Sequence, residues 1–203
     1  AHPDYVAQYS EAGLFAPILP LIDNALKSRY KRKILATLQH TPDNIYLRYA
    51  ALFITSAPDE AAKTLRALKM DNKTIGLVKR LVACHDDRPV EHGRSEEKVR
   101  RSVHKIGKDI YPLYLQLVNA DFAGKSEYGR EKGYDDYLYV VETFNKIVDE
   151  EQCTCSAELN ITGKEMIAMG VKPGPKIGDI FDRLLDMVLE NPQLNENEKL
   201  REL

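Results

Sequence analysis

The sequence has few of the residues that most enzymes use for catalysis or metal binding. Only 5 histidines and 3 cysteines occur among its 203 residues. It contains no P-loop, no G-x-S-x-G nucleophile motif, no H-E-x-x-H metal motif and no D-x-D carboxylate pair. These absences argue against the hydrolases and transferases that depend on such motifs. They predict that the chain has neither catalytic residues nor a metal site of its own.

Long hydrophobic runs and a signal peptide are also lacking. No apolar run approaches the roughly 18 to 20 residues of a membrane span. The sequence therefore predicts a soluble, cytoplasmic protein with no membrane partner. Cys84, Cys153 and Cys155 are odd in number, and the C-x-C pair lacks both the spacing and the second ligand pair of a zinc site. We expect three free thiols.

The segment His85-Asp86-Asp87 is the one concentration of possible metal ligands. Adjacent residues on a helix point about 100° apart, so His85 and Asp86 could share a metal only with ligands from elsewhere. No other histidine lies four residues from His85. We expect the segment simply to end a helix, and a metal or phosphate contact is the alternative.

Hydrophobic residues recur with helical period along nearly the whole chain, and no segment alternates as a strand does. The clearest stripes are Ile75, Val78, Leu81 and Val82; Val99, Val103 and Ile106, ended by Gly107; Ile110, Leu113, Tyr114, Leu117 and Val118; and Tyr134, Leu138, Val141, Phe144, Ile147 and Val148. Asp71 and Asn72 are placed to cap the first of these helices, and the last should begin after a polar loop over 124–129. We predict an all-α, multi-helix fold, divided near residue 150 into a helical body over 1–150 and a small helical tail over 151–203.

The tail contains the most distinctive local pattern, Gly170-Val171-Lys172-Pro173-Gly174-Pro175-Lys176-Ile177-Gly178. The two prolines fix φ, and Gly174 between them permits conformations that other residues resist. An amphipathic helix follows and stops at Asn191-Pro192. Lys172 and Lys176 flank the start of this helix, where unpaired amides favour an anion. The turn is thus either an anion site or a rigid corner whose lysines are solvated.

Charge is unevenly distributed along the chain. Residues 27–105 contain 18 lysines and arginines but 9 aspartates and glutamates, whereas the whole chain has a net charge of −2. A basic half of this kind is typical of a protein that follows a phosphate backbone, although a solvated helix surface gives the same pattern. The predicted RNA-binding residues are Arg29, Lys31, Arg32, Lys33, Lys79, Arg80, Arg100, Arg101, Lys172 and Lys176.

Several segments together resemble a known family. They are Arg48 to Phe53, Ala61 to Met70 with Asp71 to Ile75, Leu81 to Asp86, Asn119 to Asp121, and Ile161-Thr162-Gly163 to Glu196. In this order they are similar to the C-terminal half of bacterial class II tRNA nucleotidyltransferases, the CCA-adding enzymes, which are grouped with bacterial poly(A) polymerases. The resemblance implies an HD-like helical body and a tail that bind tRNA by shape and by phosphate and 2′-OH contacts.

In that family the catalytic head lies upstream and uses Mg²⁺ with CTP or ATP. None of its motifs occurs here, so the resemblance implies a chain without catalytic residues or cofactor. Many relatives also carry a Leu-His-Asp-Ile-Gly-Lys-Pro metal motif, where this chain reads Phe53-Ile54-Thr55-Ser56-Ala57-Pro58. The stretch matching an earlier histidine reads Lys31-Arg32-Lys33-Ile34. The HD-like fold should survive here as scaffold only.

These observations favour tRNA, and neither DNA nor a membrane, as the partner. A metal-dependent HD phosphohydrolase is a second hypothesis, which the loss of the ligands opposes. A helical protein–protein interaction module with a vestigial HD fold is the alternative that the charge balance allows. Whether the parent adds CCA, CC, A or poly(A) is left open by the resemblance.

Overall fold

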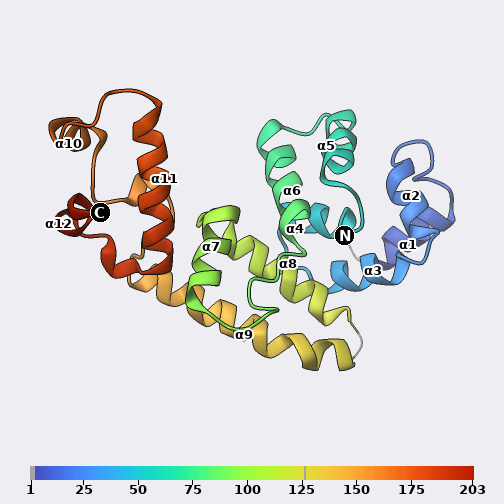
Figure 1. The fold of residues 1–203 in the computed structure, drawn as a ribbon. Coiled ribbons are helices and arrows are strands. Elements are labelled where there is room, and N and C mark those ends of the chain that lie inside the picture. Colours follow the sequence, from blue (N-terminus) through green and yellow to red (C-terminus); the bar gives the residue numbers. More distant parts are fainter. Residues whose placement is uncertain (1–2, 126) are drawn as a thin grey trace. The chain divides into compact units, whose positions relative to one another are not determined.

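The computed structural model describes residues 3–125 and 127–203 (Figure 1). Every regular element within these ranges is helical and none is a strand, which confirms the predicted all-α fold. The elements are α1 Pro3–Glu11, α2 Pro20–Leu26, α3 Lys31–His40, α4 Ile45–Leu52, α5 Pro58–Ala67, α6 Asn72–Cys84, α7 Glu96–Ile106, α8 Tyr111–Ala123, α9 Glu127–Asp149, η1 Ser156–Glu158, α10 Gly163–Ala168, α11 Pro175–Glu190, η2 Pro192–Leu194 and α12 Asn197–Glu202.

The chain divides into two compact units. Unit 1 comprises Ala1–Arg88 and Asp109–Tyr137, and unit 2 comprises Pro89–Lys108 and Leu138–Leu203. Helix α9 contributes to both. The boundary predicted near residue 150 lies inside unit 2, because residues 89–108 and 138–150 belong to the same unit as residues 151–203. Turn signals in a sequence mark where elements end, whereas the units depend on which elements pack together.

Unit 1 is organised by helix packing around α3, α4, α6 and α8. The α6 stripe of Ile75, Val78, Leu81 and Val82 is buried, as its spacing predicts. Asp71 caps this helix by accepting a hydrogen bond from the Thr74 backbone N–H at 2.9 Å, which confirms the predicted N-cap. On α8, the side chains of Tyr111, Tyr114 and Leu117 complete the core.

Helix α9 departs from its prediction in two ways. It begins at Glu127 instead of after the expected polar loop over 124–129, of which Ser126 lies outside the described residues. Its buried apolar side chains among the described residues are Val140, Phe144 and Ile147, whereas Tyr134, Leu138 and Val148 are 42%, 40% and 45% exposed. A helical repeat predicts one apolar face, but it does not determine how much of that face other elements cover.

Unit 2 has its own core, built largely on α11. Leu184, Leu185, Val188 and Leu189 are buried there, and the more N-terminal members of the predicted stripe, Ile177, Ile180 and Phe181, are half-buried. Pro175 occupies the first position of the helix and Asn191 ends it, as predicted. Helix α7 buries Val99, Val103 and Ile106 and ends at Gly107, whose φ is 99°.

The three cysteines, all described, are free thiols. Burial raises the pKa of Cys153 to about 11. Within the ranges that the structure covers, no helix is both long and apolar enough to cross a membrane.

Candidate nucleic-acid interface

The basic cluster at the start of α3 divides into paired and unpaired charges. Lys31 forms an ion pair with Glu11 at 2.8 Å. The Arg29 guanidinium lies over the Tyr30 ring, 5.1 Å from its centroid, and donates a hydrogen bond to the Tyr30 hydroxyl at 3.1 Å. Arg32 is exposed, and no described residue pairs with it. Arg32 is therefore the cation of this predicted cluster that is best placed to contact a ligand.

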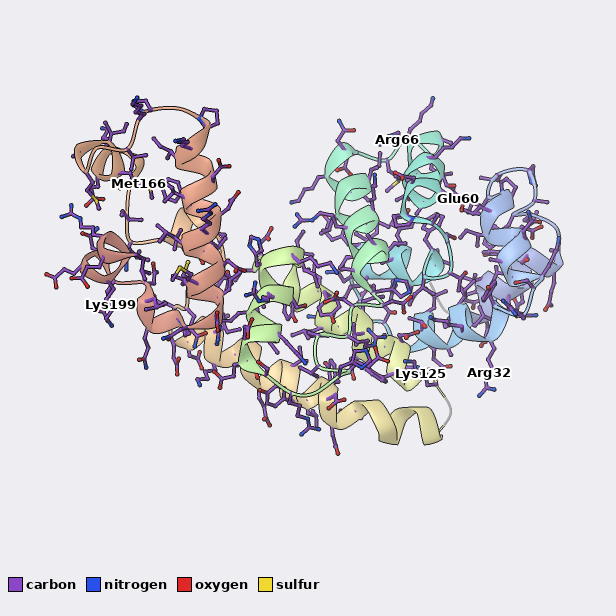
Figure 2. The ribbon with its side chains drawn as sticks, in the orientation of Figure 1. Arg32, Glu60, Arg66, Lys125, Met166 and Lys199 are labelled. Carbon is purple, nitrogen blue, oxygen red and sulfur yellow. The ribbon has the colours of Figure 1, made fainter. Side chains whose placement is uncertain are left out.

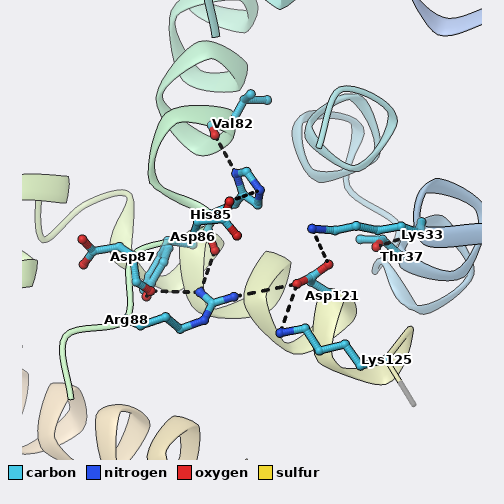
Figure 3. A network of polar contacts seen from close by, with 10 residues as sticks. Lys33, Thr37, Val82, His85, Asp86, Asp87, Arg88, Asp121 and Lys125 are labelled. Atoms are coloured by element: carbon cyan, nitrogen blue, oxygen red, sulfur yellow. Dashed lines mark hydrogen bonds and ion pairs between the residues drawn. The ribbon is translucent and has the colours of Figure 1, made fainter. Parts of the chain in front are cut away.

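Lys33 points in a different direction, towards a buried carboxylate on α8 (Figure 3). The Lys33 Nζ lies 3.4 Å from Asp121, whose side chain is 2% exposed. Arg88 and Lys125 each lie 3.7 Å from the same carboxylate. Neither oxygen of Asp121 accepts a hydrogen bond from any described residue. Three cations thus surround one buried anion, and none of them is in close hydrogen-bonding contact with it.

Backbone carbonyls and an aromatic ring hold two of these cations in place. Arg88 donates hydrogen bonds to the backbone carbonyls of His85 at 2.7 Å and Asp87 at 2.9 Å. The Phe122 ring lies under both Arg88 and Lys125, with the Lys125 Nζ 4.3 Å from its centroid. Burial lowers the pKa of Lys125, and the Asp121 carboxylate opposes this shift by raising it.

A pocket of about 380 Å³ opens beside Asp121. Its lining residues are Arg29, Arg32, Lys33, Asp121, Gly124 and Lys125. Gly124 allows α3 and α8 to approach here, because a Cβ added to it would lie 3.0 Å from the Cβ of Ala36. Arg32 and Lys125 are labelled along the same edge of unit 1 in Figure 2. Sequence reasoning missed the roles of Arg88, Asp121 and Lys125, since nothing local to α8 indicates that α3 packs against it.

The other basic pair predicted in unit 1 lies on α6 and does not line this pocket. Lys79 pairs with Asp59 at 2.5 Å, which holds the pKa of that carboxyl below its ordinary value. Arg80 beside it is exposed.

Arg100 and Arg101 in α7 are not equivalent. Arg100 is 4% exposed, and its guanidinium donates to the carbonyls of Leu189 at 2.6 Å and Glu190 at 2.9 Å. Arg101 lies nearer the surface and pairs with Glu97 at 2.7 Å and with Asp186. The burial of Arg100 removes it from the surface to which the sequence analysis assigned it.

The tail turn presents its two lysines to solvent. Lys172 and Lys176 are exposed, and neither has an ion-pair partner among the described residues. Gly174 caps α11 with a φ of 139°, a conformation that other residues rarely adopt, and Pro175 follows at the first helical position. The lysines therefore flank the start of a long helix, as the sequence predicts.

The segment His85-Asp86-Asp87 follows the last residue of α6, with His85 as its C-cap, which confirms the prediction that this segment ends a helix. His85 Nδ1 lies 2.7 Å from the Val82 carbonyl, and Nε2 lies 3.1 Å from the Asp86 carboxylate. The described residues include no group of three or more histidines, cysteines, aspartates or glutamates arranged to hold a metal ion. His85 and Asp86 alone are not the oxygen-rich ligand set that the Mg²⁺ of nucleotide transfer needs, so we assign no catalytic step to them.

A family model for tRNA nucleotidyltransferase domain 2 matches residues 43–203, most of the chain. The chain belongs to the tRNA nucleotidyltransferase domain 2 family. No curated protein and no solved structure matches it. The part matched to tRNA nucleotidyltransferase domain 2 includes Arg88, Asp121, Lys125 and the tail turn, whereas Arg29 to Lys33 precede it.

Proposed function

We propose that this chain is the tRNA-binding body and tail of a tRNA nucleotidyltransferase or a related poly(A) polymerase, acting in the cytoplasm. The family match over residues 43–203 is the observation that carries the proposal. The available cations fit it: Arg32 and the Asp121 pocket in unit 1, and Lys172 and Lys176 in unit 2. Cations of this kind contact phosphates and hold RNA without reading its bases.

In this proposal the chain does not itself transfer nucleotides. Transfer from CTP or ATP requires carboxylates that hold two metal ions near the triphosphate, and the described residues offer no such group. We propose further that the body is an HD-like scaffold without its metal site. Ile54, which is buried, and Thr55 stand where the resemblance places the His-Asp pair, so that position has neither an imidazole nor a carboxylate.

Equilibrium binding measured by fluorescence anisotropy tests the proposal. At low salt the purified chain should bind tRNA more tightly than a DNA duplex of similar charge, because an A-form surface with 2′-hydroxyls is recognised by shape. When the chain is incubated with the same tRNA, Mg²⁺ and labelled CTP or ATP, no label should be incorporated into the tRNA. Incorporation would refute the non-catalytic assignment. A failure to bind tRNA would favour the helical protein–protein interaction module.

A further inference from the structure

The pocket beside Asp121 has more positive charge than its own carboxylate can balance. Arg29, Arg32, Lys33 and Lys125 line it, against the single negative charge of Asp121. Arg88 lies just behind, 3.7 Å from the same carboxylate. Gathering like charges in a partly buried space is unfavourable unless an anion offsets their repulsion. The pocket therefore favours an anionic ligand and disfavours a metal cation.

The cations around Asp121 retain unused hydrogen-bonding capacity. A charge-assisted hydrogen bond between nitrogen and oxygen is about 2.7 to 2.9 Å long. Lys33 and Lys125 lie 3.4 and 3.7 Å from Asp121, well beyond that distance. Neither ammonium donates a side-chain hydrogen bond to any residue that the structure describes. Each therefore has donors available for a ligand with several acceptor oxygens.

From this arrangement we propose that the pocket binds one phosphate group of the RNA backbone, through Arg32 and Lys125 with Arg29 and Lys33 beside them. The RNA source of the phosphate rests on the proposed function, whereas the pocket itself does not. Phosphate fits because it presents several acceptor oxygens to cations that converge from the start of α3 and from the turn after α8.

Two variants of unit 1 test this assignment. Arg32→Gln/Lys125→Gln removes two charges from the pocket. Lys63→Gln/Lys73→Gln is the matched control, since both lysines are exposed in the same unit and neither lines the pocket. Inorganic phosphate, titrated against chloride at equal ionic strength, should shift the backbone amide NMR signals of Gly124 and Lys125 in wild type and control. The pocket variant should not show these shifts.

Binding of tRNA provides the second measurement. Both pocket cations contact the same phosphate in this proposal. Their joint removal should therefore reduce the slope of log affinity against log salt by about one, and not by two. At 0.1 M salt this corresponds to a roughly tenfold loss of affinity. The control should keep the wild-type slope.

Three results would overturn parts of this account, and they are distinguishable. If the pocket variant keeps the wild-type slope of log tRNA affinity against log salt, the pocket does not bind an RNA phosphate, although the proposed function stands. Phosphate shifts that persist in that variant would refute the pocket. If wild type fails to bind tRNA while phosphate still shifts Gly124, the proposed function and the RNA source both fail, and the ligand is a free phosphate or phosphomonoester.

Discussion

At the scale of single residues, Arg100 has a structural role that its neighbour Arg101 does not share. The carbonyls of Leu189 and Glu190 belong to the last turn of α11, where helical carbonyls have no partner within the helix. Arg100 donates to both of them from a buried position. Arg101 pairs with carboxylates closer to the surface, where ion pairs contribute little to stability.

Substitution of each arginine by methionine should therefore have unequal effects. Arg100→Met should lower the free energy of unfolding by about 3 kcal/mol, because it leaves one buried and one partly buried carbonyl without this donor. Arg101→Met should lower it by less than about 1 kcal/mol. Urea denaturation of the two variants measures the difference. Equal losses would contradict the role assigned to Arg100.

The sequence could not distinguish these arginines. Both lie in one basic run, and the carbonyl that Arg100 contacts is 89 residues away along the chain. The same limit applies to Asp121, whose cationic neighbour Lys33 is on a different helix. Charge seen in a sequence predicts a basic surface, but only the fold determines which cations are paired.

At the scale of elements, local signals predicted helix caps correctly, whereas the polar loop expected over 124–129 was wrong because α9 begins at Glu127. Asp71 at the start of α6 and Pro175 at the start of α11 act where the sequence places them, because caps depend on neighbouring backbone groups. Helix α10 has a full capping box. The Thr162 side chain accepts from the Glu165 N–H, and the Glu165 carboxylate accepts from the Thr162 N–H at 2.8 Å.

This capping box should make tail stability depend on pH in the acid range. Hydrogen bonds from Thr162 and Asn197 lower the pKa of Glu165 from 4.5 to about 2. A carboxyl with a lowered folded-state pKa stabilises the protein above its unfolded value, and this contribution is lost as pH falls from about 4.5 through about 2. The stability difference between wild type and Glu165→Gln should therefore shrink between pH 6 and pH 2.5. Urea unfolding at both pH values checks this, and a difference independent of pH would count against it.

The contact between α8 and α9 can be tested through a glycine. A Cβ at Gly133 would lie 2.7 Å from the ring of Phe122, which is 5% exposed and cannot move freely. Gly133→Ala should lower stability, because the clash outweighs the gain of about 1 kcal/mol in helix propensity. Gly76→Ala is the matched control, since nothing lies within 4 Å of its added Cβ, and it should raise stability. Thermal unfolding of both variants gives the comparison, and a stabilised Gly133→Ala would show that the packing is looser than described.

At the scale of the whole molecule, the two units together present a small number of available positive charges to a phosphate backbone. The basic excess of residues 27–105 overstates them, because Lys31, Lys79 and Arg101 each pair with a carboxylate. Arg32, the pocket cations and the tail lysines are what the two units offer to a phosphate backbone. Binding through so few contacts should be weak and electrostatic.

The salt dependence of tRNA binding tests this central claim most directly. Anisotropy with labelled tRNA, repeated over a series of salt concentrations, gives the slope of log affinity against log salt for the wild-type chain. The account predicts measurable binding at low salt and a negative slope of a few units, as expected when a handful of phosphates is neutralised. Absence of binding at low salt, or an affinity that does not change with salt, would contradict it.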